Sequence, residues 1–344
     1  MTAAELAKSL KLSRTTVSLV LNKRAEAYGI PAETIQRVRE AARLSKYTAN
    51  PVARQLAGKR SNSIGVLINT ASIVDPRLIQ SMEMLASQRQ LRFIVGYAVG
   101  NEREIRTYVD DFRARGVDAI FALNHNHPAS REFIYDELGR AGRVLYFYKP
   151  QSGGLDAWFV EPDFYEVGRL ATQHLIDRGR RRIAMTCISE ATYPVMRPRQ
   201  MACAETLNAS GLGYDPDLVY ELDEQVSSHW TDAIAESNAD AIVDKLVVRG
   251  GADAIVSTSD LEAIRLVTAL ARAGRRVPDD VAVVGTDNLG VASLVPPYIT
   301  NVDLRLNELA DASVNLLFEM IEATSGAPGR GVVVKPQLIV RQSS

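Results

Sequence analysis

Residues 278–288 read Pro-Asp-Asp-Val-Ala-Val-Val-Gly-Thr-Asp-Asn, a short apolar run rich in β-branched residues and bounded on both sides by polar ones. Such a run predicts a buried strand from Val281 to Gly285. Asp287 follows this strand almost directly. Because ligands of open α/β sheets bind beyond the carboxyl ends of the strands, we expect Asp287 to be a binding residue. Its carboxylate has the lone pairs to accept two hydroxyl hydrogens.

The same pattern recurs over most of the chain, where apolar runs alternate with amphipathic segments. The other predicted strands are Ile64–Asn69, Phe93–Val99, Ala119–Leu123, Val144–Tyr148, Ile183–Ile188 and Ala254–Ser257. The predicted helices lie near residues 76–90, 101–115, 130–141, 164–178, 198–210, 232–249, 260–274 and 305–323. This alternation predicts an α/β core with parallel sheets covered by helices, and the chain is long enough for two lobes.

The amino-terminal stretch has a different pattern. Apolar periodicity predicts three short helices, at Thr2–Leu10, Arg14–Asn22 and Ala32–Leu44. Ser13 is suited to cap the second helix. Three short helices with a tight turn between the first two predict a small all-α helix-turn-helix head over residues 1–48.

The charge is distributed unevenly between the head and the rest of the chain. Residues 1–60 hold 12 Lys and Arg and 4 Glu, which gives a formal charge of +8. The remaining residues hold 28 basic and 37 acidic side chains, which gives −9. A basic terminus on an acidic body indicates a nucleic-acid-binding end.

The overall composition sets the broad class. A length of 344 residues predicts two or three domains. The hydrophobic fraction of 46% and the charged fraction of 24% are ordinary for a globular protein. We find no apolar run long enough for a membrane span and no secretory signal, so we expect a cytoplasmic protein. Cys187 and Cys203 lack a paired spacing and are expected to be buried thiols.

Three stretches, in this order, resemble the lactose-repressor (LacI) family of bacterial regulators. Leu12–Asn22 is similar to that family's turn and recognition helix, and Lys46–Gly58 to its hinge. Pro278–Asn288, followed by Pro297–Val302, resembles the closing strand, the ligand-binding acid and the return crossover of its core. Weaker similarity lies at Gly116–Ile120 and His174–Ala184, so the resemblance covers nearly the whole chain.

The resemblance implies a transcription repressor of carbohydrate-metabolism genes that binds a palindromic operator as a homodimer under allosteric control by a sugar-like effector. It implies no enzymatic activity, no cofactor, no metal and no membrane partner. The head at 1–48 is followed by a hinge at 49–60 and a core at 61–344 like that of periplasmic binding proteins. Lobe one is expected at 61–160 and 290–323, and lobe two at 161–289 and 324–341.

The resemblance also places the DNA contacts. The first residues of the recognition helix would face base edges in the major groove, and these are Arg14, Thr15, Thr16 and Ser18. Ser13 and Asn22 would hold phosphates. In the hinge, Leu56 would wedge into the minor groove, with Asn50, Ala53 and Arg54 beside it.

Two residues of the head depart from the family pattern. Leu19 stands where the family usually has Arg, so the operator sequence does not carry over from relatives. Lys11 stands where the family usually has Gly, and a left-handed turn there would cost about 1 kcal/mol.

For the effector, the resemblance adds Arg199 to Asp287 as a ligand contact. Asp163 and Ser259 stand at family positions that border the ligand, although each is also suited to cap a helix. Tyr193 is a candidate for ring stacking, as are Trp158 and Trp230, and each of the three is also suited to packing. Residues 69–78 depart most from the family, so no contacts are carried over there. His125 and His127 lack a third metal ligand.

Three alternatives stay open. The first is a corepressor-type regulator that senses a purine or a phosphorylated metabolite. The second is a sugar-binding module, and the third is an α/β enzyme with a fused head. Against the enzyme, Pro216 stands where a dinucleotide fingerprint needs its third glycine, and Ala53 where a phosphate loop needs its first.

Overall fold

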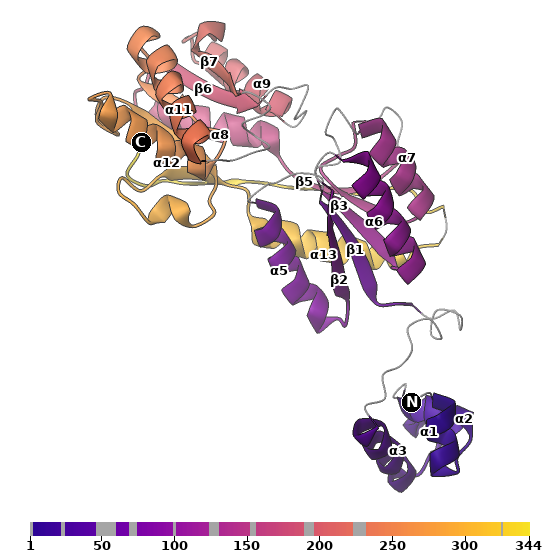
Figure 1. Ribbon diagram of the computed structural model, residues 1–344. Coiled ribbons are helices and arrows are strands. Elements are labelled where there is room, and N and C mark those ends of the chain that lie inside the picture. The colour runs from indigo at the N-terminus through magenta and orange to yellow at the C-terminus, as the bar shows by residue number, and fades with distance from the viewer. Residues whose placement is uncertain are drawn as a thin grey trace. The chain divides into compact units, whose positions relative to one another are not determined.

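The computed structural model describes residues 3–21, 25–45, 60–68, 74–98, 101–123, 131–151, 156–188, 196–222, 232–324 and 326–344. The chain divides into two compact units, Met1–Ser61 and Asn62–Ser344, and each is described by itself (Figure 1). Among the helices of the described ranges, none is long and apolar enough to cross a membrane.

The first unit is a small helical head. Its helices are α1 (Ala3–Leu10), α2 (Arg14–Leu21), the 3-10 turn η1 (Glu26–Tyr28) and α3 (Ala32–Leu44). Leu6, Val17, Val20 and Val38 form its buried core. The Oγ atom of Ser13 accepts a hydrogen bond from the backbone N–H of Thr16 at 2.9 Å and so caps α2, as predicted.

The second unit contains two six-stranded sheets, and the first has the strand order β11-β5-β4-β3-β1-β2. Its strands are β1 (Ser63–Ile68), β2 (Arg92–Tyr97), β3 (Ala119–Leu123), β4 (Val144–Phe147), β5 (Trp158–Pro162) and β11 (Gly331–Val334). All of its neighbouring strands pair in parallel. One face packs against α5 (Val74–Gln88) and α13 (Leu306–Glu322), and the other against α6 (Glu102–Arg115) and α7 (Arg131–Ala141).

The second sheet has the order β12-β10-β9-β8-β6-β7. Its strands are β6 (Ile183–Ile188), β7 (Val219–Leu222), β8 (Ala254–Val256), β9 (Ala282–Asp287), β10 (Thr300–Asp303) and β12 (Gln337–Ile339). Only β12 pairs antiparallel, with β10. Helices α8 (Phe164–Asp177) and α9 (Met196–Ala209) pack on one face, and α11 (Asp232–Val243) and α12 (Asp260–Arg272) on the other. Short turns η2 (Pro216–Leu218), η3 (Asp244–Arg249) and η4 (Val291–Ser293) complete the unit. The two-lobed α/β core with parallel sheets is therefore confirmed.

The division of the core differs from the expected one in its last third. Thr300–Asp303 pairs with β9 in the second sheet, although residues 290–323 were expected in lobe one. Gly331–Val334 pairs with β5 in the first sheet, although 324–341 were expected in lobe two. Both strands have only four residues, and their pairing is decided by the neighbouring strand rather than by a local apolar pattern.

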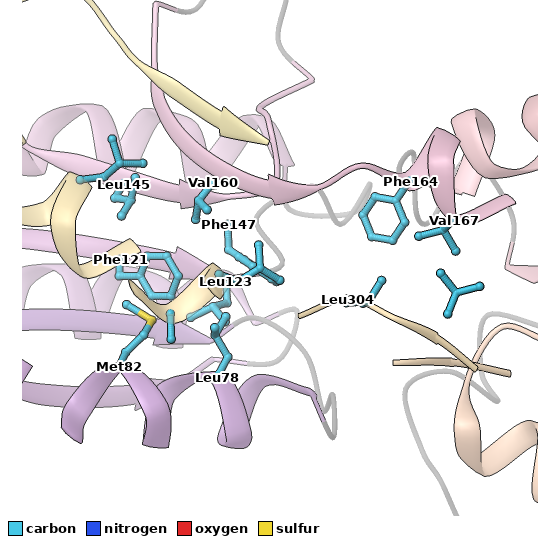
Figure 2. Close-up of a cluster of buried hydrophobic side chains, with 14 of the residues drawn as sticks. Leu78, Met82, Phe121, Leu123, Leu145, Phe147, Val160, Phe164, Val167 and Leu304 are labelled. Carbon is cyan, nitrogen blue, oxygen red and sulfur yellow. The ribbon is translucent and has the colours of Figure 1, made fainter. Parts of the chain in front are cut away.

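Figure 2 shows how the first lobe is packed. Leu78 and Met82 of α5 point toward Phe121, Leu145 and other apolar side chains of the sheet. Each of these side chains is almost completely buried. Burial of one such side chain stabilises the fold by about 1.5–3 kcal/mol, so this packing holds α5 against the first sheet.

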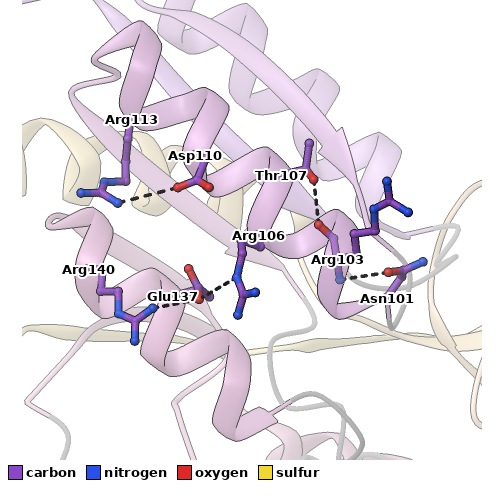
Figure 3. A network of polar contacts seen from close by, with 8 residues as sticks. All are labelled: Asn101, Arg103, Arg106, Thr107, Asp110, Arg113, Glu137 and Arg140. Atoms are coloured by element: carbon purple, nitrogen blue, oxygen red, sulfur yellow. Dashed lines mark hydrogen bonds and ion pairs between the residues drawn. The ribbon is translucent and has the colours of Figure 1, made fainter.

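A polar network fastens the other face of the first sheet (Figure 3). The Asn101 side chain accepts hydrogen bonds from the backbone N–H groups of Arg103 and Glu104, at 3.0 and 3.2 Å, and caps α6. Glu137 of α7 is nearly buried. Its Oε1 atom forms ion pairs with Arg106 Nε of α6 at 3.3 Å and with Arg140 Nη1 at 3.0 Å. The pair Arg106–Glu137 thus joins the two helices.

Candidate functional site

In the head, the predicted base-contacting residues lie on the outer side of α2. Arg14, Thr15 and Ser18 are exposed, whereas Val17 and Val20 face the core. The Thr16 hydroxyl lies 2.8 Å from that of Ser13, so both belong to the start of the helix. The arrangement presents Arg14 and Thr15 to a partner, as a recognition helix must.

In the turn before α2, Lys11 adopts a left-handed backbone conformation, which is unfavourable for a residue with a side chain. Lys11 has a φ of +55°, in the left-handed region. The N–H of Leu12 donates to the carbonyl of Ala7 at 3.0 Å, and the N–H of Lys11 donates to that of Lys8 at 3.2 Å. These bonds close α1 with a left-handed cap, which glycine adopts most readily.

Several predicted site residues lie outside the described part of the chain. In the head and hinge these are Asn22, Asn50, Ala53, Arg54 and Leu56, and in the core they are His125, His127, Tyr193 and Trp230. Their roles stay predictions. Trp158 is described and opens β5, so it lies at the opposite end of its strand from the carboxyl edge where ligands bind.

Asp287 is the last residue of β9, in the middle of the second sheet. The residue is buried, with 8% of its surface exposed, and its φ is +94°. Burial and, to a lesser extent, nearby Asp260 raise the pKa of its carboxyl to about 8, while Arg199 opposes the shift. No hydrogen bond from a described residue contributes to this environment. Asp287 therefore has unused capacity to accept hydrogen bonds.

Arg199 lies on α9 and is 1% exposed. Its Nη1 donates to the carbonyl of Thr258 at 3.2 Å and its Nη2 to that of Ser257. Its Nε is buried without a hydrogen-bond partner. Burial lowers the pKa of the guanidinium, while Asp287 is among the acidic groups that oppose this. The structure thus brings the two predicted ligand residues into one electrostatic environment.

Gly168 on α8 allows Arg199 to occupy this position. A Cβ atom at Gly168 would lie 2.2 Å from the backbone carbonyl oxygen of Arg199. No real Cβ contact is that short, so any side chain here would push α9 away from α8.

Two further acids of this site were missed by the sequence analysis. Asp260 is fully buried, and its Oδ2 accepts the backbone N–H of Leu289 at 2.5 Å. Glu262 is 6% exposed, and its Oε2 accepts hydrogen bonds from Thr186 Oγ1 at 2.6 Å and from Ser257 Oγ at 2.7 Å. The backbone N–H and the hydroxyl of Thr258 donate to the same atom, each at 2.7 Å. The sequence did contain an indication that Glu262 is buried, because Glu262 lies one turn before Leu266 on the apolar face of α12.

Asp163 and Ser259 are helix caps. The Asp163 carboxylate accepts the N–H of Glu166 at 2.9 Å at the start of α8. The Ser259 hydroxyl accepts the N–H of Glu262 at 3.3 Å at the start of α12. Of the two roles considered for these residues, capping is the one that their contacts show, and contact with a ligand stays a prediction. Cys187 and Cys203 are buried free thiols, as expected.

Comparison with known proteins identifies the class. Residues 172–344 match the model of the periplasmic binding protein-like domain. The regulator CelR of Thermobifida fusca is 28% identical over 342 residues, covering 96% of this chain and 95% of its own. The repressor PurR of Histophilus somni strain 129Pt is 25% identical over 344 residues, covering 99% and 98%.

Solved structures of such regulators are also similar to this chain in fold. A complex of CelR with cellobiose aligns over 100% of both chains, with a TM-score of 0.71 and 25% identity. The lac repressor dimer bound to operator and the anti-inducer ONPF aligns over 100% of this chain and 98% of its own, with a TM-score of 0.81 and 21% identity, and supports the fold.

A helix-turn-helix head on a periplasmic-binding-protein-like core defines a class of ligand-responsive DNA-binding proteins. The chain belongs to the LacI family of transcriptional regulators.

Proposed function

We propose that this protein is a repressor of carbohydrate-metabolism genes that binds a palindromic operator as a homodimer and responds to a small sugar-like effector. The observation that carries the proposal is the buried Asp287 carboxylate, which lies at the end of a central strand without a hydrogen bond from the described residues. Sugar hydroxyls are donors of the kind that such a carboxylate accepts. A relative, CelR, is described in complex with cellobiose.

The head supplies the operator contacts in this proposal. Arg14 and Thr15 are exposed at the start of α2, where a recognition helix meets base edges. The hinge residues Asn50, Ala53, Arg54 and Leu56 would bind the minor groove at the operator centre. The work of the protein would therefore take place in the cytoplasm, where the operator DNA is.

Control by the effector requires two states of the protein with different affinities for it. A ligand that binds one state better shifts the population toward that state, and operator affinity changes by the same coupling free energy. In the leading form of the proposal the effector releases the operator. Because several relatives are repressors named PurR, a corepressor that strengthens operator binding is the second candidate.

We further propose that the protein is not an enzyme and uses no cofactor or metal. In the site, Arg199 donates to the backbone carbonyls of Ser257 and Thr258, and Glu262 accepts the backbone N–H of Thr258, so these groups are engaged in holding the end of β8 in place. Turnover of a bound sugar would contradict this part of the proposal.

A thermal-shift screen of the full chain against sugars, sugar phosphates, sugar acids and nucleobases tests the effector assignment. A ligand at about 100 times its dissociation constant should add roughly 2.7 kcal/mol of stability. The expected result is stabilisation by a sugar that is lost in Asp287→Ala. Stabilisation by a nucleobase alone would favour the corepressor candidate, and no stabilisation by any compound would overturn the effector assignment.

A further inference from the structure

The candidate effector site contains more acids than its guanidinium groups can neutralise. Glu262 and Asp287 interact electrostatically with Arg199 there, Asp260 interacts with Asp287, and Arg341 interacts with Asp260. Arg341 donates to the carbonyl of Ile299 and to the Asn288 side chain, each at 2.7 Å. Among the described residues, these acids are not arranged to hold a metal ion.

Several donors next to the start of α12 are already in use. The N-terminus of a helix is an anion-binding position, because its backbone N–H groups have no helical partner. At α12 the Glu262 carboxylate accepts the N–H and hydroxyl of Thr258, and the Ser259 hydroxyl accepts the N–H of Glu262. Asp260 accepts the N–H of Leu289. The protein's own carboxylates therefore take up donors that lie next to the start of the helix, those of Thr258 and Leu289.

The guanidinium of Arg199 is also engaged. A carboxylate or phosphate is normally held by the two-pronged fork of such a group. Here both terminal nitrogens donate to the carbonyls of Ser257 and Thr258, and the remaining Nε is buried. An anionic ligand would have to break these bonds and lie beside the Glu262 carboxylate and the acidic side chains of Asp260 and Asp287.

The unused polar capacity of the site is mostly that of an acceptor. Asp287 receives no hydrogen bond from the described residues, and the Oε1 atom of Glu262 is buried without a partner. A complementary ligand brings hydroxyl or ammonium donors, since an unpaired buried acceptor costs about 1–3 kcal/mol.

We propose that the effector is an uncharged or amine-bearing polyhydroxyl compound, and that Glu262 excludes phosphorylated and carboxylated ligands by taking up the donors of Thr186, Ser257 and Thr258. This inference rests on the proposed function, because it concerns the same site. Glu262 acts as a specificity-determining residue that holds Thr186, Ser257 and Thr258 in place.

Calorimetry on the full-length protein with matched sets of sugars tests the exclusion of anions. Each set contains a neutral sugar, its amino sugar, its phosphate and its sugar acid, for example glucose, glucosamine, glucose 6-phosphate and gluconate. In every set with a binding member, we expect the phosphate and the acid to bind at least about 100-fold more weakly than the neutral sugar. An anionic member that binds as tightly as the neutral sugar would overturn the inference.

Two isosteric variants test the role of Glu262. In Glu262→Gln the penalty against the anionic members should shrink by about tenfold, because one buried charge is removed without a change of shape. Asp311→Asn removes a charge from the exposed side of α13 and should leave the penalty unchanged. An unchanged penalty in Glu262→Gln would overturn its assigned role. If no member of any set binds, the proposed function itself fails, and this inference fails with it.

Discussion

At the scale of single residues, Asp287 makes stability depend on pH. Its pKa is raised to about 8 from an ordinary value of 3.8, chiefly by burial. Between these values the folded protein keeps a proton that the unfolded chain has released, so stability falls as pH rises through this window. Asp287→Asn cannot ionise. We therefore expect the variant to gain stability relative to the wild type by more than about 2 kcal/mol between pH 4 and pH 8.

Chemical denaturation at a series of pH values measures this difference. Asp311→Asn is the matched control, because it makes the same chemical change at an exposed position. A stability difference between Asp287→Asn and the wild type that does not vary with pH would show that the carboxyl ionises normally in the folded protein.

Gly168 of α8 supports the site by allowing close contact with the backbone of Arg199. Gly168→Ala would place a Cβ atom 2.2 Å from the carbonyl oxygen of Arg199, and α9 must move to avoid it. Overpacking of this kind costs about 1–3 kcal/mol, and the shift should also weaken effector binding. Gly139→Ala is a suitable comparison, because nothing lies within 4 Å of a Cβ there. Effector affinity equal to the wild type in Gly168→Ala would contradict the role given to this contact.

How far the site could be predicted also differs between residues. Asp287 follows a strand whose pattern is plain, and the family resemblance pointed to Arg199, so both were named before the fold was known. Glu262 was missed because an acid on an apolar helix face looks like an interruption of the pattern. Its burial depends on donors from Ser257 and Thr258, just before α12, and from Thr186 of β6, which lies 76 residues earlier.

At the scale of elements, the turn between α1 and α2 carries a removable strain. Lys11 has a φ of +55°, where a side chain costs about 1–2 kcal/mol and glycine costs nothing. Lys11→Gly should stabilise the head by roughly 0.5–1 kcal/mol, because it relieves this strain. The gain is smaller than the strain itself, because glycine loses more conformational entropy on folding than lysine does. Hydrogen exchange of the α1 and α2 amides in the full chain measures the change. Slower exchange is expected, and faster exchange would contradict the prediction.

Long and strongly periodic elements were predicted well, whereas several short strands were missed. Helices such as α3 and strands such as β3 agree with the predicted bounds. The strands β5, β7, β10, β11 and β12 were missed, and each has three to five residues. Because the chain crosses between sheets at these short strands, the expected lobe limits near 290 and 324 differed from the structure.

At the scale of the whole molecule, the hinge should separate DNA binding from effector binding. Leu56 lies outside the described residues, and its role as a minor-groove wedge stays a prediction. Leu56→Ala should weaken operator binding by about a few kcal/mol, the energy that a wedge contributes through bending the duplex. Effector affinity should not change. Fluorescence anisotropy with operator DNA measures the operator affinity, and calorimetry with the effector measures the effector affinity. An unaltered operator affinity would contradict the role of Leu56 as a wedge.

The central claim is that effector binding at Asp287 controls DNA binding by the head. The most direct test measures operator affinity of the full-length protein with and without the effector found by the screen, for the wild type and for Asp287→Ala. The account predicts a change of about 5- to 150-fold in the wild type, and none in the variant at the same effector concentration. An equal change in both proteins would place the effector elsewhere, and no change in the wild type would contradict the account as a whole.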